Sequence, residues 1–307
     1  MSNPEYINPI EQLIHSTVRI ECDLGGGAIS TGTGYFYVFF EDEEKNVPCI
    51  VTNKHVVQGA INGVINLTVA NDGKPELGNF KSFTIENFER QCIFHDDANI
   101  DLAIFPIAPL LHQAEEAKVS FHYIPLAKPT IATDELLNSL SSMEDIVMIG
   151  YPNGIWDSTH NLPIIRRGIT ATHPRLGYNG KPEFVIDAAC FSGSSGSPVF
   201  LANLGSYMDA SGALCVGSRI ALLGTLYAGP IKKATGEIEI IKVPTDTKAI
   251  SKTDIMINLG YVIQASKLLD FEPKLRKLLE PKVLISRNAP CSCNSGNRYK
   301  NCCGKVA

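Results

Sequence analysis

The chain lacks any uncharged apolar run of about 18 residues, the length that a membrane-spanning helix needs, so no transmembrane helix is expected. Residues 1–6 contain neither the basic nor the apolar segment of a secretory signal peptide. Positive charge is in deficit, and the net charge of −5 argues against general nucleic-acid binding. Internal repeats and low-complexity segments are also missing. These absences leave a 307-residue chain of ordinary globular composition, long enough for one large domain or two smaller ones.

Cysteine and charge are unevenly distributed. Five of the nine cysteines stand singly in apolar, strand-like segments: Cys22, Cys49, Cys92, Cys190 and Cys215. Such residues are expected to be free buried thiols in a reducing compartment, which favours a cytoplasmic location. Residues 265–307 hold nine Lys and Arg against three Asp and Glu, a charge of +6, which leaves −11 for the first 264 residues. This basic end is either a solvated helix and tail or a docking segment for an acidic partner.

Short apolar segments separated by turn residues predict a mainly β protein. Six strands are expected in a first barrel within residues 16–125, and six in a second within 140–264. The expected strands are 17–22, 35–40, 49–57, 66–69, 81–85, 102–105, 145–150, 163–172, 182–188, 199–201, 219–228 and 255–263. Helices are expected at 7–14 and 266–279, and a hairpin within 231–252.

The segment 193–198, with the sequence GSSGSP, lies between two strand-like apolar runs. A serine between glycines in a tight turn can expose its hydroxyl and aim neighbouring backbone N–H groups at one point, as acyl transfer requires. An ordinary hairpin loop has the same composition. Two further segments favour chemistry: His55 ends one apolar strand and Asp101 begins another. The chain order His, Asp, Ser is that of the catalytic triad in chymotrypsin-like barrels.

The sequence resembles the trypsin-like serine peptidases, most closely their disulfide-free bacterial branch, which includes the high-temperature-requirement proteases. The resemblance covers about residues 16–270 and rests on several short motifs: GTGY at 32–35, VTNKHV at 51–56, DLA at 101–103, IGYP at 149–152, DA at 187–188, GSSGSP at 193–198 and NLGY at 258–261. One departure is Ser197, where the family usually has a second glycine. The resemblance implies a chymotrypsin-like double six-stranded β-barrel.

The resemblance also implies roles for individual residues. Ser195 would be the nucleophile, His55 its general base and Asp101 the carboxylate that orients the imidazole. The nearby Asp96 and Asp97 lie in a polar loop and are not expected to take part. The backbone N–H groups of Gly193 and Ser195 would form the oxyanion hole, and catalysis needs no cofactor.

Substrate-binding residues follow from the same resemblance. Ala189 would lie at the base of the primary specificity pocket, where the lack of charge favours cleavage after small or medium apolar residues. The edge strand that pairs with a protein or peptide substrate would comprise Thr225, Leu226 and Tyr227.

A second motif lies near the end of the chain. Four cysteines fall within 13 residues, as C-x-C followed by C-C: Cys291, Cys293, Cys302 and Cys303. Four thiolates can surround a structural Zn²⁺ ion tetrahedrally, and disulfide bonds are the alternative. Residues 287–304 resemble the SEC-C zinc motif, which implies a docking module for another protein or a ribosome-like surface. The expected domains are a peptidase at 1–280, a linker at 281–288 and the zinc motif at 289–307.

These observations predict an intracellular serine endopeptidase that forms an acyl-enzyme and carries a zinc-stabilised docking module. A role in stress or anti-phage response rests on association alone. One alternative is a catalytically latent or inactive peptide-binding protein with the peptidase fold. Another is an adapter whose zinc module mediates partner binding while the barrels act as a scaffold.

Overall fold

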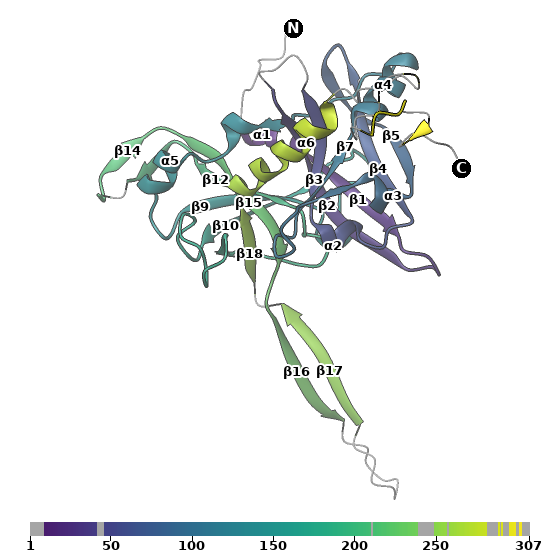
Figure 1. Cartoon of the computed structure of the whole chain (residues 1–307). Coiled ribbons are helices and arrows are strands. Elements are labelled where there is room, and N and C mark those ends of the chain that lie inside the picture. The colour runs from purple at the N-terminus through teal and green to yellow at the C-terminus, as the bar shows by residue number, and fades with distance from the viewer. Residues whose placement is uncertain are drawn as a thin grey trace, which may run out of the picture. The chain divides into compact units, whose positions relative to one another are not determined.

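The computed structural model describes residues 9–41, 46–209, 211–238, 249–256, 258–280, 288, 290, 295–298 and 301–302. The chain divides into two compact units, residues 1–270 and residues 271–307. The first unit contains all the strands of the described residues, in two β-sheet halves that lie side by side and two separate hairpins (Figure 1). The predicted domain boundaries stay a prediction.

The N-terminal half is one sheet of eight strands, where about six were predicted. Its strands are β1 (Thr17–Asp23), β2 (Ile29–Phe39), β3 (Val47–Thr52), β4 (Asn62–Asn71), β5 (Lys74–Glu86), β6 (Ile93–Phe94), β7 (Ala103–Pro106) and β8 (Leu126–Ala127). They pair in the order β5-β4-β1-β2-β3-β7-β6, and β8 adds to β2 in parallel. The additional strands, β6 and β8, have two residues each, which is too short for a periodic sequence signal.

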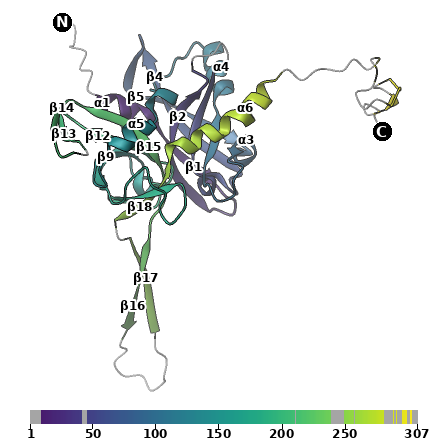
Figure 2. The ribbon, with the colours of Figure 1, turned by 60° about the vertical axis from the view of Figure 1, so that its left-hand side comes forward.

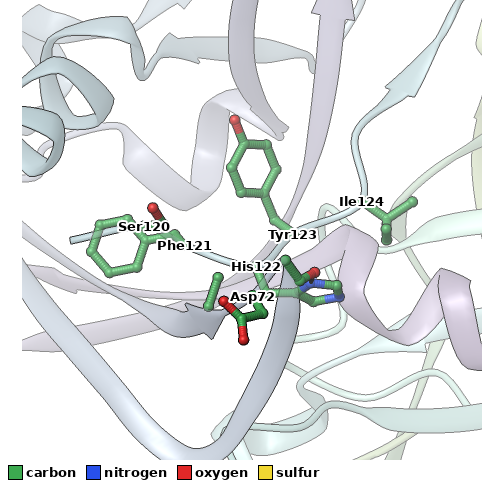
Figure 3. Close-up of a pocket in the computed structure, with 8 residues that line it drawn as sticks. Asp72, Ser120, Phe121, His122, Tyr123 and Ile124 are labelled. Atoms are coloured by element: carbon green, nitrogen blue, oxygen red, sulfur yellow. Dashed lines mark hydrogen bonds between the residues drawn. The ribbon is translucent and has the colours of Figure 1, made fainter. Parts of the chain in front are cut away.

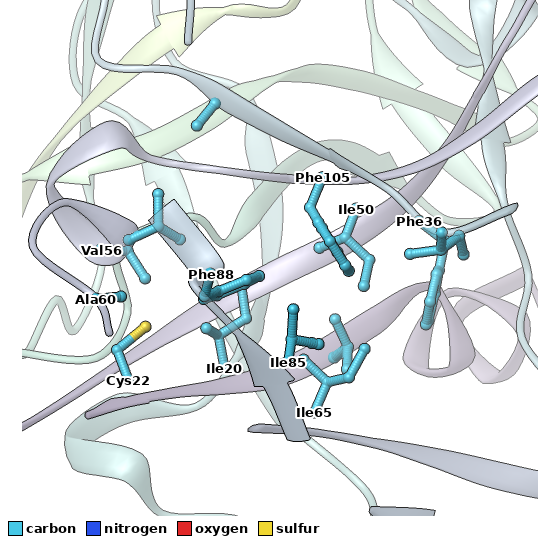
Figure 4. Packing of buried hydrophobic residues seen from close by; sticks show 14 of the residues in the cluster. Ile20, Cys22, Phe36, Ile50, Val56, Ala60, Ile65, Ile85, Phe88 and Phe105 are labelled. Carbon is cyan, nitrogen blue, oxygen red and sulfur yellow. The ribbon is translucent and has the colours of Figure 1, made fainter. Parts of the chain in front are cut away.

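Apolar side chains from these strands form a continuous core (Figure 4). Ile20, Phe36 and Ile50 come from β1, β2 and β3, and all are at most 3% exposed. Close packing requires glycine on β2, because a Cβ at Gly34 would lie 2.5 Å from Ile50 Cγ2. The β2 glycines of the GTGY motif therefore let neighbouring strands approach closely, which brings the turn after β3 against β2.

The C-terminal half is a closed six-stranded barrel, as predicted. It runs in the order β10-β11-β18-β15-β12-β9. The strands are β9 (Asp145–Gly150), β10 (Ile164–Thr170), β11 (Glu183–Asp187), β12 (Pro198–Asn203), β15 (Arg219–Ala228) and β18 (Leu259–Gln264). Their inward residues form a second core that includes Met148, Phe184, Leu201 and Val262. Closure leaves the loops at the strand ends as the places where a site can form.

Two hairpins project from this barrel. β13 (Ser206–Met208) pairs with β14 (Leu214–Val216), and β16 (Ile231–Ile238) pairs with β17 (Ala249–Met256). The second hairpin confirms the one expected within 231–252 and is inserted between the neighbouring barrel strands β15 and β18, as Figure 2 shows. The strand predicted at 255–263 is thus divided between β17 and β18.

The helices are short. They are α1 (Pro9–Leu13), α2 (Lys54–Val57), α3 (Phe88–Gln91), α4 (Ala108–Glu116), α5 (Asp134–Ser139) and α6 (Glu272–Leu279), with 3-10 turns η1 (Ile14–Ser16), η2 (Lys128–Thr130), η3 (Pro152–Gly154) and η4 (Ala265–Phe271). The strand predicted at 49–57 is wrong beyond Thr52, because residues 54–57 form the helical turn α2. The helix predicted at 266–279 is divided into η4 and α6. Within the described ranges, no helix has the length and apolarity that a membrane span requires.

Candidate active site

His55 lies on the single helical turn that follows β3. The apolar strand ends at Thr52, and buried Val56 and Val57 hold the next turn against the core. The His55 side chain remains 47% exposed. This combination fixes the backbone of the histidine while leaving its ring accessible to a substrate.

Asp101 contacts His55 from the segment that leads into β7. Its Oδ2 atom is 2.5 Å from His55 Nδ1, and its Oδ1 accepts a hydrogen bond from the His55 backbone N–H at 3.1 Å. Asn53 Nδ2 donates to the Asp101 carbonyl at 2.6 Å, which fixes the aspartate backbone as well. A carboxylate at Nδ1 favours the tautomer with its proton there, so Nε2 is left as the acceptor.

Asp97 has a different role from Asp101. Its carboxylate accepts hydrogen bonds from the backbone N–H and the side-chain amide of Asn99, and these bonds lower its pKa. Its carbonyl accepts a hydrogen bond from Lys54 Nζ at 2.8 Å. Asp97 therefore shapes the loop before Asp101.

Ser195 lies in the turn between β11 and β12. Its carbonyl accepts a hydrogen bond from Thr33 N at 2.9 Å, and the next residue, Gly196, donates to Leu226 O at 2.8 Å. Gly196 has a φ of 88°, and a Cβ there would collide with the Thr33 carbonyl, so glycine is required. The Ser195 hydroxyl donates to Tyr227 O at 3.3 Å. No hydrogen bond joins it to His55, although both residues lie in the described part of the chain.

The backbone N–H groups of Gly193 and Ser195 have no hydrogen-bond acceptor among the described residues. The carbonyls of the same two peptide groups are occupied: Ser192 O accepts from Asn153 N at 2.5 Å, and Ser194 O accepts from Ser197 N at 3.0 Å. In a trans peptide the C=O and N–H point in opposite directions. The Gly193 N–H therefore points away from Asn153 N, and the Ser195 N–H points away from Ser197 N.

Thr33, on β2, connects the two halves of the site. Its hydroxyl donates to Gly193 O and accepts from Tyr151 N, both at 3.0 Å. Its carbonyl accepts from the hydroxyl of Thr52, three residues before His55. The side chain is fully buried. Thr33 belongs to the GTGY motif, but its pairing with Gly193 joins residues 160 positions apart, and no local sequence signal indicates it.

Ser197, which stands where the family usually has a second glycine, causes no backbone strain. Its φ is not positive, so the second glycine of the family pattern is unnecessary here. Its buried side chain lies against Gly150, where a Cβ would collide with the Ser197 Oγ. The glycine at 150 therefore provides the space for the serine at 197.

The expected edge strand needs a correction. Thr225 pairs with Pro198 on β12 and Ile263 on β18, so it lies inside the closed barrel. Leu226 likewise pairs with β18 and exchanges hydrogen bonds with the Ser195 turn through Gly196 and Ser197. Neither residue has a free edge, because Thr225 is paired with a strand on each side and Leu226 is bonded to β18 on one side and to the Ser195 turn on the other. Only Tyr227 presents its carbonyl to Ser195, and its phenol donates to Glu183 Oε2.

Ala189 is half-buried and lies two residues after the end of β11. Its neighbour Cys190 faces the barrel interior, where a Cβ at Gly260 would lie 2.7 Å from Cys190 Sγ and 2.6 Å from Leu226 Cδ1. Burial raises the pKa of the Cys190 thiol to about 11, so the thiol is neutral. The Ala189 carbonyl accepts a hydrogen bond from Arg166 Nη1, a contact that no local sequence signal indicates.

A cavity of about 520 Å³ lies elsewhere in the molecule, and none of the predicted site residues lines it. Figure 3 shows the segment Ser120 to Ile124 passing beside Asp72, and His122 Nδ1 lies 3.1 Å from Gly73 O. The described lining contains no nucleophile paired with a base.

Of the four predicted zinc ligands, only Cys302 lies within the described residues. Its sulfur is 3.2 Å from Ser295 Oγ. Cys291, Cys293 and Cys303 lie outside the described residues. Among the residues searched, no group of three or more potential ligands was found.

Residues 32–206 match the family model of the trypsin-like peptidase domain. This match spans more than half of the chain, and the chain therefore belongs to the trypsin-like peptidase family. The predicted mainly β, chymotrypsin-like fold is confirmed.

Comparison with curated proteins gave no match. Among solved structures, the chain is similar to the active form of the Rv3671c protease from M. tuberculosis, with 17% identity, 87% of this chain and 84% of that chain covered, and a TM-score of 0.40. It is also similar to Deg5, with 21% identity, 72% and 83% covered, and a TM-score of 0.43. A serine endoprotease from Yersinia pestis gives 15% identity, 90% and 68% covered, and a TM-score of 0.43.

Proposed function

We propose that this protein is a serine endopeptidase in which Ser195, His55 and Asp101 form the catalytic triad. The observation that carries the proposal is the His55–Asp101 pair together with a turn whose free N–H groups flank Ser195. The His55–Asp101 pair supplies a general base of defined tautomer. The turn at Ser195 supplies hydrogen-bond donors for the negative charge that develops on the substrate carbonyl oxygen.

The proposed reaction begins with movement of the Ser195 hydroxyl from Tyr227 O to His55 Nε2. A change of one side-chain torsion moves the hydroxyl, and catalytic hydrogen bonds often tighten only when substrate is bound. Ser195 Oγ then attacks the peptide carbonyl while His55 takes its proton. The oxyanion accepts hydrogen bonds from the N–H groups of Gly193 and Ser195. Asp101 stabilises the imidazolium.

Three proton transfers complete the cycle. The imidazolium of His55 protonates the leaving amine, and the acyl group remains on Ser195 Oγ. Water then attacks the acyl-enzyme with His55 again as general base, and the acid is released as the serine regains its proton. Tyr227 O would accept the N–H of the residue before the scissile bond once Ser195 has left it.

The residues next to Ala189 support a preference for small or medium apolar residues before the scissile bond. Ala189 itself is small and uncharged, and the thiol of its neighbour Cys190 is neutral. Cleavage of a randomised peptide library tests this preference. Dominance of Lys or Arg before the scissile bond would contradict it.

We also propose a structural zinc site formed by Cys291, Cys293, Cys302 and Cys303, with a docking role for the basic C-terminal segment. The donor set fits the metal, since four closely spaced thiolates match tetrahedral Zn²⁺. When bound, zinc would supply folding free energy to the segment. The proposed location is a reducing cytoplasm, supported by free thiols at Cys22, Cys49, Cys92, Cys190 and Cys215. Stress or anti-phage response is the proposed setting.

One observation favours a second candidate function, a latent or inactive peptide-binding protein. The Ser195 hydroxyl donates to Tyr227 O rather than to His55. A fluorophosphonate probe separates the two candidates, because it reacts only with an activated serine. Labelling of the wild-type chain, lost in S195A and H55A and kept in the exposed-loop variant D97N, supports the peptidase. An unlabelled wild-type chain that still binds peptides supports the alternative.

A further inference from the structure

Arg166 is a charged residue directed inward from barrel strand β10. Its neighbours on the strand are exposed: Ile165 is 45% exposed, and the side chain of Arg167 is 74% exposed and pairs with Asp145. Alternation along a strand places Arg166 on the opposite face. Burial lowers the pKa of its guanidinium to about 10, so the group remains positively charged at neutral pH.

The guanidinium binds both ends of the turn that precedes the nucleophile. Nη1 donates to Ala189 O at 2.7 Å and to Ser194 Oγ at 2.8 Å. Ser194 is fully buried, and its Oγ also accepts from Phe191 N at 3.3 Å. One nitrogen therefore fastens the first residue of the segment 189–194 to the last.

The burial of Arg166 lowers the stability of the fold. Nε and Nη2 of Arg166 are buried and have no hydrogen-bond partner among the described residues. Among the described residues, no carboxylate forms an ion pair with Arg166. A buried cation with unmet donors and no carboxylate lowers stability relative to an apolar side chain. An apolar residue would fill a barrel interior at lower cost, which indicates that the contacts with the turn are what Arg166 provides.

The turn that Arg166 binds sets the direction of the two free N–H groups. Ser194 contributes the carbonyl of the peptide whose N–H belongs to Ser195, and Gly193 lies inside the fastened segment. We propose that Arg166 is a positioning residue that holds the segment 189–194 so that the Gly193 and Ser195 N–H groups converge on the oxyanion. The inference rests on the proposed peptidase function, and Arg166 acts through the turn without touching substrate.

The test uses the full-length chain, with Arg166 changed to Met and to Lys and with Arg167→Met as the matched control. The substrate is a fluorogenic tetrapeptide with Ala before the scissile bond, and the inhibitor is the corresponding peptide boronic acid. R166M should lower kcat by about 100-fold, in the range found when an oxyanion donor is lost, while KM changes by less than about threefold. Boronate affinity should fall in parallel with kcat, and R167M should stay within about twofold of wild type.

R166K should recover part of the lost kcat, because an ammonium can still donate to Ala189 O or to Ser194 Oγ. S194A removes one acceptor, and a loss of about tenfold in kcat at unchanged KM is expected. Circular dichroism and thermal unfolding check that each variant is folded. If R166M does not fold, R166K and S194A decide the question, and wild-type kcat in both would overturn the proposal.

Two results separate this inference from the peptidase proposal. If the wild-type chain does not react with the fluorophosphonate, the peptidase proposal fails and the positioning role fails with it. If the wild-type chain reacts and folded R166M has a kcat within about twofold of wild type, only the positioning role of Arg166 is rejected. A rise in KM with unchanged kcat would reject it as well, because that pattern reports weaker substrate binding alone.

Discussion

The acid–base part of the candidate site consists of two side chains, whereas the oxyanion part consists of backbone N–H groups. His55 and Asp101 come from connections between strands of the N-terminal sheet and contact each other directly. Gly193 and Ser195 come from a turn of the C-terminal barrel, and their orientation depends on residues elsewhere. The first part therefore depends on which residues are present, and the second on how the fold holds a turn.

The comparison predicts unequal effects of substitution. Removing a reacting side chain removes a chemical step, whereas disturbing the turn only weakens transition-state stabilisation. The expected losses of activity therefore decrease from the triad, through the oxyanion turn and its supports, to the C-terminal segment.

Ser195→Ala and His55→Ala should each reduce kcat by about 10⁶-fold, because nucleophile and base act as one unit and their losses are not additive. The double variant should be no slower than either single variant. Steady-state hydrolysis of a fluorogenic peptide measures the effect. Turnover within about 100-fold of wild type in either purified variant would reject the triad assignment.

Asp101→Asn should reduce kcat by about 10⁴-fold, because an amide in place of the carboxylate no longer favours the tautomer with the proton on Nδ1. Asp97→Asn is the matched control, since Asp97 lies four residues away and only shapes its loop. The control should keep kcat within about twofold of wild type. Equal losses in both variants would show that loop structure, not the carboxylate at Asp101, supports activity.

Gly193→Ala should reduce kcat by about 10² to 10³-fold, the range for loss of one oxyanion donor. Gly193 has a φ of 79°, and a Cβ would lie 2.7 Å from Tyr151 O and 3.0 Å from Gly154 N. The turn must move to accommodate the methyl group. Gly180→Ala is a control with a φ of 76° and no atom near the added Cβ, and it should affect only stability. Wild-type kcat in G193A would contradict the oxyanion assignment.

Thr33→Val tests the support of the turn from the other half of the molecule. The change leaves Gly193 O without its donor and Tyr151 N without its acceptor in a buried place. We expect the free energy of unfolding to fall by about 1–3 kcal/mol and kcat to fall by about tenfold, since small misplacements of reacting groups slow catalysis. Denaturant unfolding and peptide hydrolysis measure the two effects. A stability loss with unchanged kcat would show that the turn holds without Thr33.

The same division explains what the sequence can predict. Five of the six barrel strands overlap their predicted ranges closely, and the order His55, Asp101, Ser195 is readable because each residue borders an apolar strand. The sequence does not indicate the helical turn after Thr52, because Val56 and Val57 suit a strand as well as a buried helical turn. The contacts of Arg166 and Thr33 with the turn link residues 28 and 160 positions apart, and such contacts depend on tertiary packing rather than on local pattern.

The smallest effect on chemistry is expected from the C-terminal segment, because none of the residues assigned to either part of the site belongs to it. Truncation after residue 286 should leave hydrolysis of a fluorogenic peptide within about twofold of wild type. The full-length chain, purified under reducing conditions without chelator, should contain about one zinc per chain, and the truncated chain none. The double variant C291S/C293S is the matched control, because it removes two proposed ligands and keeps the chain length. Absence of zinc from the full-length chain would reject the metal site. A large loss of peptide hydrolysis on truncation would instead show that the C-terminal segment supports the active site. The segment would then be a third part of the site, beside the acid–base pair and the oxyanion turn.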